Sequence, residues 1–195
     1  MYCRSASVLA IVSALALAIS PAYAKTVKKE KLPAAATTDA KAKPDPKAKG
    51  KPVPVETYGD WSTFVGQTGK AKTCYALSQP RDRLPAGLKR DPAFLFISTR
   101  PAENVKNEVS FIMGFGVKEG AVTSAEIGDE SFELVGKGVN GWVKNPAEEP
   151  KFVATLRKGS KLVVKMPSAK GNVTTDTYSL SGLSQALDRA AKECQ

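Results

Sequence analysis

The sequence predicts a mainly β domain over residues 56–195, with an α-helix at its C-terminal end and one further short helix. Two observations carry this prediction. From Glu56 onward, short apolar runs alternate with turn-forming residues, which is typical of strands in one domain of ordinary size. Helical spacing of apolar residues occurs in only two segments, residues 148–158 and 182–194.

Eight apolar runs are predicted to be strands. They cover residues 57–65, 73–78, 93–99, 108–115, 131–135, 139–143, 161–166 and 174–179. Segments that contain glycine or proline separate them, at residues 66–69, 85–87, 118–120 and 170–172. Residues 94–97, Phe-Leu-Phe-Ile, are apolar on both faces of their strand, so a covering layer is expected on each side of it.

The two helices are predicted from the spacing of their apolar residues. In residues 148–158, an apolar face precedes Gly159, which is expected to end the helix. The second segment is more regular, with apolar residues at i, i+3, i+4, i+7, i+8 and i+11, namely Leu183, Ala186, Leu187, Ala190, Ala191 and Cys194. Ser181 is predicted to cap its N-terminus.

Residues 1–24 have the three zones of a cleavable secretory signal. Arg4 supplies the positive charge, residues 8–19 form an apolar run, and Ala22-Tyr-Ala24 is a small-x-small cleavage site. The run is shorter than the roughly 20 residues of a membrane-spanning helix, although a retained anchor is the alternative. The working protein is therefore expected to begin near Lys25, without a transmembrane segment, in the periplasm or at the cell envelope or outside the cell.

Removal of the signal would also remove Cys3, which leaves Cys74 and Cys194 in an oxidising compartment. Cys3 precedes the apolar run, which argues against a lipid-modified cysteine at the cleavage point. Because Cys194 lies on the apolar side of its predicted helix, Cys74 and Cys194 are predicted to form a disulfide. The alternative is two separate buried thiols.

Residues 25–55 are predicted to form a disordered basic arm. They contain nine lysines and three acidic residues, a net charge of +6, and five prolines among few large apolar side chains. Residues 56–195 hold 19 basic and 16 acidic side chains and are nearly balanced. The arm is therefore the part of the chain that an anionic partner would attract, or else it is a spacer without a target.

The sequence excludes several kinds of catalytic site. It has no histidine, so Ser-His-Asp, Cys-His and His-rich metal sites are absent, and no serine lies three residues before a lysine. No nucleophile elbow or phosphate-binding glycine loop is present, and we expect no cofactor and no metal. A carboxylate pair of the glycosidase type remains open. Its candidates are Asp60, Asp129, Glu130, Glu148, Glu149 and Asp176.

Four aromatic residues have two interpretations. Tyr58, Trp61, Tyr75 and Trp142 would form a stacking surface for sugar or nucleic acid, or they would pack in the core. Core packing is the favoured interpretation, because Trp61 alternates with Thr63 and Val65 as on one buried strand face. Nucleic acid is not expected as a partner, since the lysine arm has no interleaved aromatic residues.

Four motifs suggest a known family. They are Tyr58-Gly-Asp-Trp61, Thr73-Cys-Tyr-Ala-Leu77, Leu156-Arg-Lys-Gly-Ser-Lys-Leu162 and Tyr178-Ser-Leu-Ser-Gly-Leu-Ser-Gln-Ala-Leu187. In their order and spacing, residues 56–195 resemble the invasion-associated locus B family of alphaproteobacterial exported proteins. The resemblance implies an immunoglobulin-like β-sandwich in the periplasm or outer envelope, an association with host-cell invasion in some pathogens, and no catalytic residues. The family-motif residues that it marks are Gly59, Asp60, Trp61, Ser179, Leu180, Ser181 and Gly182.

Three functions follow as hypotheses. The leading one is a non-catalytic envelope protein whose arm, residues 25–55, binds an anionic component such as lipopolysaccharide, membrane headgroups or cell-wall polymer. The first alternative is an envelope glycan hydrolase with two carboxylates across an aromatic cleft. The second is a structural or chaperone-like subunit of an envelope complex, which an exposed apolar patch or an unpaired strand edge would favour.

Overall fold

The computed structural model describes residues 51–195 of the chain. The predicted signal, residues 1–24, lies outside the described residues, as do residues 25–50 of the predicted arm. The first strand begins at Val53, so the last three residues of the predicted arm belong to the sheet.

Residues 51–195 form eleven strands and two α-helices, which confirms the predicted mainly β class with a C-terminal helix and one further short helix. The strands are β1 (Val53–Tyr58), β2 (Trp61–Thr68), β3 (Ala71–Ser78), β4 (Asp82–Leu84), β5 (Phe94–Arg100), β6 (Val105–Ile112), β7 (Val122–Ile127), β8 (Glu130–Lys137), β9 (Asn140–Val143), β10 (Lys161–Pro167) and β11 (Val173–Ser179). The helices are α1 (Glu149–Lys158) and α2 (Leu183–Glu193), and short 3₁₀ turns occupy Pro101–Glu103 and Pro146–Glu148.

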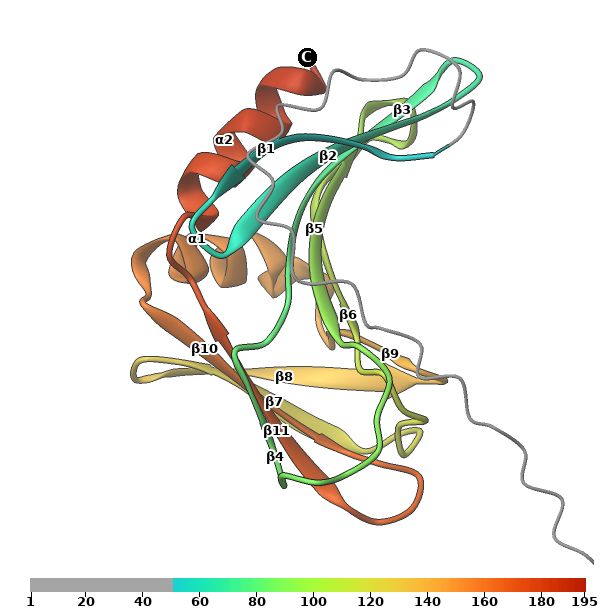
Figure 1. Cartoon of the computed structure of the whole chain (residues 1–195), viewed down its shortest axis with the longest axis vertical. Coiled ribbons are helices and arrows are strands. Elements are labelled where there is room, and N and C mark those ends of the chain that lie inside the picture. Colours follow the sequence, from blue (N-terminus) through green and yellow to red (C-terminus); the bar gives the residue numbers. More distant parts are fainter. Residues whose placement is uncertain (1–50) are drawn as a thin grey trace, which may run out of the picture. The chain divides into compact units, whose positions relative to one another are not determined.

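All eleven strands belong to one antiparallel sheet in the order β1-β2-β3-β5-β6-β9-β8-β7-β10-β11-β4. The sheet bends strongly, so that β2, β3, β5 and β6 run across the direction of β7, β8, β10 and β11 (Figure 1). The two layers that the family resemblance implies are therefore two halves of one continuous sheet. β4 follows β3 in the sequence but pairs with β11 at the opposite edge.

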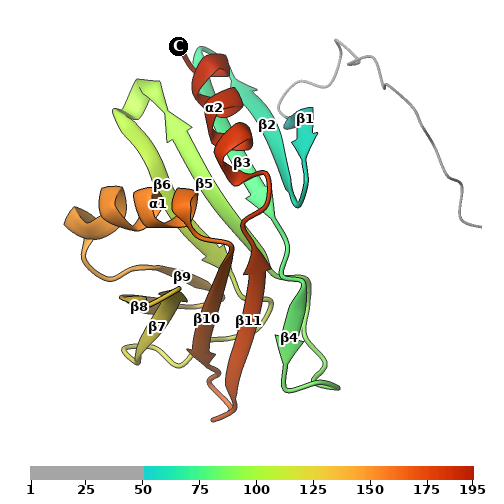
Figure 2. The same ribbon diagram turned by 90° about the vertical axis from the view of Figure 1, so that its left-hand side faces the viewer.

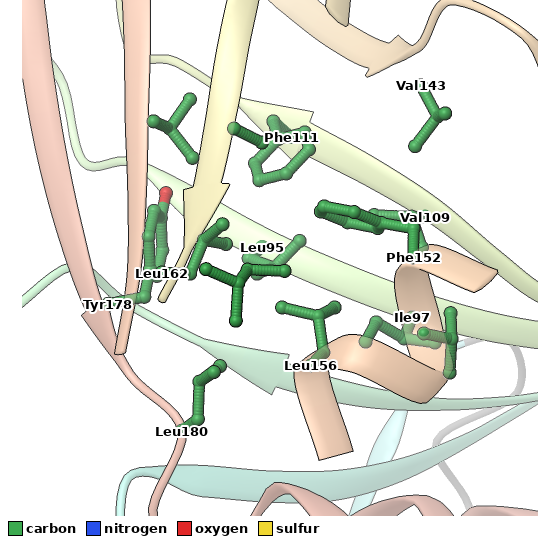
Figure 3. Packing of buried hydrophobic residues seen from close by; sticks show 14 of the residues in the cluster. Leu95, Ile97, Val109, Phe111, Val143, Phe152, Leu156, Leu162, Tyr178 and Leu180 are labelled. Atoms are coloured by element: carbon green, nitrogen blue, oxygen red, sulfur yellow. The ribbon is translucent and has the colours of Figure 1, made fainter. Parts of the chain in front are cut away.

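The core lies between the two halves of the sheet and α1. Leu95 and Phe111 from one half face Leu162 and Tyr178 from the other, and Leu156 of α1 packs beside them (Figure 3). The rings of Phe111 and Tyr178 meet edge to face with their centroids 6.4 Å apart. Both halves therefore bury their inward side chains in the same apolar cluster.

Helix α1 is the predicted short helix, and it ends at Gly159 as predicted. Its buried residues are Phe152, Val153 and Leu156, which are the residues of the predicted apolar face. The Phe152 ring packs edge to face on Phe132 of β8 with centroids 4.9 Å apart. This contact holds α1 against the sheet.

Helix α2 is also as predicted, with Leu183, Ala186, Leu187 and Ala190 buried, but its cap is different. The capping position is Gly182 in the left-handed conformation, with φ of 90°, and no side chain caps the helix. The prediction that Ser181 caps this helix is therefore wrong. Glycine is needed at this position because a Cβ on Gly182 would lie 1.8 Å from the carbonyl oxygen of Tyr58.

The strands differ from the prediction at three places. Residues 57–65 are not one strand, because Gly59, with φ of 55°, and Asp60 make a tight turn between β1 and β2. The short β4 was not predicted. β7 was not predicted either, because Thr123, Ser124 and Glu126 are polar and leave too few apolar residues around its two buried side chains to mark a strand in the sequence. Within residues 51–195, no helix combines the length and the apolar character needed to cross a membrane.

Candidate functional site

The structure brings the two halves of the family motif together. The backbone N–H of Asp60 donates to the Ser181 carbonyl at 3.1 Å, and Trp61 Nε1 donates to the Ser179 carbonyl at 3.0 Å. A Cβ on Gly59 would lie 2.7 Å from the Ser181 carbonyl oxygen, so glycine is needed for this approach. We call this group the motif clasp: Gly59, Asp60, Trp61, Ser179, Leu180, Ser181 and Gly182. It joins the β1–β2 turn to the connection between β11 and α2.

The Asp60 carboxylate is held within the motif clasp. A hydrogen bond from the Ser179 side chain lowers the pKa of Asp60 below its usual range, and the ion pair with Arg81 lowers this pKa further. A carboxylate stabilised in its ionised form is poorly suited to be a general acid. The ionised Asp60 carboxylate therefore links the motif clasp to Arg81.

Cys74 and Cys194 form a disulfide in the structure, with their Cα atoms 5.9 Å apart. The bond connects the end of α2 to the middle of β3. Cys74 is fully buried, and it is on the same strand face as Ala76, which also lies buried in the core. The disulfide and the motif clasp therefore hold α2 at its two ends.

Asp176 is the most deeply buried of the six acidic candidates, and two arginines bind it. Arg83 Nε lies 3.3 Å and Arg90 Nη1 lies 3.2 Å from its Oδ1 atom. Burial raises the pKa of Asp176, and the two guanidinium groups oppose this rise. The nearby hydroxyl of Tyr178 is buried without a hydrogen-bond partner among the described residues, and its burial raises the pKa of Tyr178.

The other acidic candidates do not form a catalytic pair. Glu130 pairs with Lys151, and Asp129 and Glu148 are exposed. Glu149 Oε1 accepts a hydrogen bond from the Val109 backbone N–H at 2.8 Å. Burial raises the pKa of Glu149, and the charge of Glu108 adds to this effect.

Among the hollows in the surface of residues 51–195, three have an acidic side chain in their walls. They are lined by Asp60, by Asp91 and by Glu149 respectively, and none of the three has a second acid. A glycosidase of the common type needs two acids across one cleft. Residues 51–195 also contain no group of three or more His, Cys, Asp or Glu side chains placed to hold a metal ion.

The feature that stands out is the outward side of the sheet from β2 to β9. We call it the aromatic face, and its side chains are Phe64, Tyr75, Leu77, Phe94, Phe96, Ile112 and Trp142, all partly exposed. The residues between them on the same strands point inward and are buried, among them Ala76, Leu95 and Phe111. On the other side of the sheet, α2 packs against β2, β3 and β5, and α1 packs against β6 (Figure 2).

Cross-strand pairing aligns the side chains of the aromatic face. Leu77 is opposite Phe96, Phe96 is opposite Ser110, and Ser110 is opposite Trp142. In the adjacent row, the rings of Phe64 and Tyr75 stack with centroids 5.3 Å apart and planes inclined by 12°. The Tyr75 and Phe96 centroids are 5.5 Å apart, so the rings form a continuous surface.

One edge of the aromatic face is hollowed next to the motif clasp. The hollow has a volume of about 500 Å³, and Phe64, Leu77 and Phe94 line it together with the Asp60 and Arg81 pair. It therefore has an apolar floor and a charged rim. This combination is common where a protein surface binds another molecule.

The aromatic residues were only partly predicted. Trp61 is in the core as expected, whereas Tyr75 and Trp142 lie on the aromatic face. Tyr58 is partly buried against the core. The predicted covering of residues 94–97 on both sides is wrong for the described chain, because only Leu95 and Ile97 face the core. The apolar residues on both faces of this strand were nevertheless the sequence signal from which the aromatic face could have been predicted.

Comparison with known proteins identifies one family. A family model described as invasion associated locus B (IalB) protein matches residues 61–191. The matched range includes Cys74, Trp61 and residues 179–182 of the motif clasp, while Gly59 and Asp60 lie just before it and Cys194 just beyond it. No curated protein and no solved structure matches the chain significantly.

Proposed function

The chain belongs to the invasion-associated locus B family, and from this premise we propose that it is a non-catalytic exported protein that acts as an interaction module in the periplasm or on the cell surface. Proteins of this family are exported envelope proteins in general. The acidic side chains support the non-catalytic part of the proposal, because Asp60, Glu130 and Asp176 are all engaged by basic partners. The predicted signal at residues 1–24 supports the location.

The aromatic face is the observation that carries this proposal. An antiparallel sheet with one free side ordinarily places polar residues on that side. Here Phe64, Phe94, Phe96 and Trp142 occupy it, and neither helix covers it. Large apolar patches on soluble proteins mark the sites where other molecules bind.

The arrangement of the rings favours a protein partner. Because Phe64 and Tyr75 stack on one another, each covers one face of the other ring. A sugar ring binds an aromatic side chain through a free face, whereas apolar side chains of a protein pack well against ring edges. This geometry supports the structural or chaperone-like subunit hypothesis over a glycan-binding surface.

The arm adds a second contact to this proposal. Residues 25–55 carry a net charge of +6, which attracts lipopolysaccharide, membrane headgroups or an anionic cell-wall polymer. The arm would hold the protein at the envelope, and the aromatic face would bind the partner.

Site-specific photo-crosslinking tests the aromatic face. A benzophenone amino acid replaces Tyr75, whose ring lies next to Phe64 and Phe96 on the aromatic face, and the same residue at the exposed Val173 of β11 is the matched control. We expect crosslinking in envelope preparations to give a discrete protein adduct from position 75 and none from position 173. An identical adduct pattern from both positions, or none from position 75, would contradict the proposal.

Deletion of residues 25–50 tests the arm and leaves β1 intact. We expect the shortened protein to lose its low-salt retention on anionic vesicles or cell envelopes while its thermal unfolding stays the same. Equal retention of the two proteins would show that the arm does not hold the protein there.

A further inference from the structure

A second hollow lies at the end of the domain opposite α2. The β4–β5 connection, the β6–β7 connection and the β10–β11 turn enclose it, and the tips of β4, β10 and β11 gather at the lower end of Figure 1, far from the C-terminus. Its volume is about 740 Å³. We call it the basic hollow, and its lining includes Lys89, Arg90, Asp91, Ser168, Lys170 and Asn172.

The charged side chains of the basic hollow do not balance. Lys89, Arg90 and Lys170 face a single acid, Asp91. Within residues 51–195, neither Lys89 nor Lys170 forms an ion pair. The hollow therefore has an excess of positive charge that no neighbouring carboxylate neutralises.

Arg90 forms the fixed part of the wall. Its side chain is only 7% exposed, and Nη1 binds Asp176 at 3.2 Å. Nη2 donates to the carbonyls of Arg83 at 2.9 Å and Pro85 at 3.2 Å. The remaining N–H groups of the guanidinium, on Nε and on Nη1, have no acceptor among the described residues.

The charge behind this wall is also positive. Asp176 is fully buried, and both Arg83 and Arg90 share its single carboxylate. Counted together, Lys89, Lys170, Arg83 and Arg90 carry four positive charges, and Asp91 and Asp176 carry two negative ones, which leaves a net charge of +2 around the hollow. Charges act more strongly in a protein interior than in water, so this excess favours an anion in the adjoining space.

The walls of the basic hollow are held in place by backbone contacts. The Asp91 N–H donates to the Gly114 carbonyl at 2.9 Å, and the Ala169 N–H donates to the Gly116 carbonyl at 2.8 Å. Gly114 has φ of 70°, and a Cβ there would lie 2.1 Å from the Asp91 carbonyl oxygen. The hollow is therefore formed before any ligand arrives, which lowers the entropic cost of binding.

A hydroxyl group completes the set of donors. Ser168 Oγ accepts a hydrogen bond from the Asn172 backbone N–H at 3.1 Å, which leaves its own O–H to donate. Two ammonium groups, a fixed guanidinium and a hydroxyl are the donors that bind the oxygens of a phosphate or sulfate group.

We infer that the basic hollow is a binding site for a phosphate or sulfate group, with Lys89 and Lys170 as mobile cations and Arg90 as the fixed one. This site belongs to the folded domain. It is independent of the anion binding proposed for residues 25–55 and of the aromatic face. The group bound is either a free oxyanion or the phosphate of a lipid headgroup, and the two sources share the same recognition chemistry.

Calorimetric titration of residues 25–195 with inorganic phosphate and with sulfate at low ionic strength tests this inference. The test variant combines Lys89→Gln and Lys170→Gln, because Arg90 has structural contacts and its loss would disturb the fold. The control variant combines Lys161→Gln and Lys192→Gln, which are equally exposed lysines without an ion pair in the described chain and give the same change in net charge. We expect the test variant to bind at least about tenfold more weakly and the control to change less than about twofold.

Two further measurements make the outcome clear. The amide NMR signals of residues 168–172 are expected to shift on addition of phosphate in the wild type and to stay unchanged in the test variant. Equal losses in both variants, or no saturable binding of phosphate or sulfate, would overturn the inference.

The same proteins without residues 25–50, added to vesicles with and without phosphatidylglycerol, distinguish the two sources of the bound group. Lysine-dependent binding to the anionic vesicles indicates a lipid headgroup, and its absence indicates a free oxyanion.

Discussion

The indole Nε1 of Trp61 donates a hydrogen bond of 3.0 Å to the backbone carbonyl of Ser179, 118 residues further along the chain. Trp61 begins β2, and Ser179 ends β11. The bond therefore joins the two halves of the bent sheet at the point where α2 leaves it. Residues from opposite ends of the domain meet at this contact and at the neighbouring hydrogen bond from the Asp60 N–H to the Ser181 carbonyl.

Replacement of Trp61 tests the importance of this contact. Trp61→Phe removes the hydrogen bond and leaves a cavity at a side chain that is fully buried. We expect the free energy of unfolding to fall by about 2–4 kcal/mol in urea denaturation. Trp142→Phe on the aromatic face is the control, and its expected loss is below about 1 kcal/mol because Trp142 is partly exposed. Equal losses would mean that the Trp61 contact has no special role.

Two glycines with similar backbone angles should differ sharply in their tolerance of alanine. Gly182→Ala places a Cβ 1.8 Å from the Tyr58 carbonyl oxygen, at φ of 90°. We expect a loss of about 3–5 kcal/mol, which combines steric overlap with backbone strain. Gly171→Ala has φ of 86° but meets no atom within 4 Å, so only the strain of about 1–2 kcal/mol remains. Thermal unfolding of both variants measures the difference, and a similar loss in each would contradict the tight packing at Gly182.

The Cys74–Cys194 disulfide closes a long loop. Because the cysteines are separated by 120 positions in the sequence, the bond is expected to stabilise the fold by on the order of 4–5 kcal/mol through its effect on the unfolded chain. Urea denaturation of the Cys74→Ala, Cys194→Ala double variant measures this loss. Intact mass after alkylation of the unfolded, unreduced protein is the companion measurement. Two alkyl labels on residues 25–195 would show that the cysteines are free.

Glu149 should give the stability a pH dependence of known sign. Because burial raises the pKa of Glu149, the folded protein holds its proton more tightly than the unfolded chain does. The stability from this protonation is complete below the unfolded pKa and is lost as the pH rises through the folded pKa. Glu149→Gln keeps an oxygen for the Val109 N–H but cannot ionise. We expect the variant to gain stability relative to the wild type between about pH 4 and pH 7.

Urea denaturation across this pH range measures the effect, with Glu148→Gln at the exposed neighbouring position as the control. A difference between Glu149→Gln and wild type that does not change with pH would show that burial of this carboxyl has no consequence for folding.

Local patterns predicted the helices well, because the buried side of each helix is determined by residues that are close in the sequence. The buried residues of α2 are among those with predicted helical spacing. The predicted cap was wrong because Gly182 packs closely on the carbonyl of Tyr58, which lies more than a hundred residues earlier, and the local sequence does not show this contact. β4 was missed for a similar reason, since its three residues are a strand only through pairing with β11.

The features of the candidate site also divide into those that the sequence alone indicates and those that depend on the fold. Cys74 and Cys194 were paired by counting cysteines in an oxidising compartment, which needs no knowledge of the fold. The apolar character of Phe94 and Phe96 was also visible, but periodicity does not tell whether a second layer covers such a face. Arg90 gave no local signal, because its importance depends on Asp176 and on three connections that only the fold brings together.

The position of β4 affects the order in which the sheet can be completed. Residues 82–84 are made soon after β3, yet their partner on β11, residues 175–177, follows about ninety residues later. Until β11 is present, residues 82–84 have no partner strand, whereas β3 and β5 are close in the sequence and pair directly with each other. Arg83 and Arg90 are likewise without Asp176 until that moment. β11 therefore supplies both the partner strand of β4 and the carboxylate that Arg83 and Arg90 share.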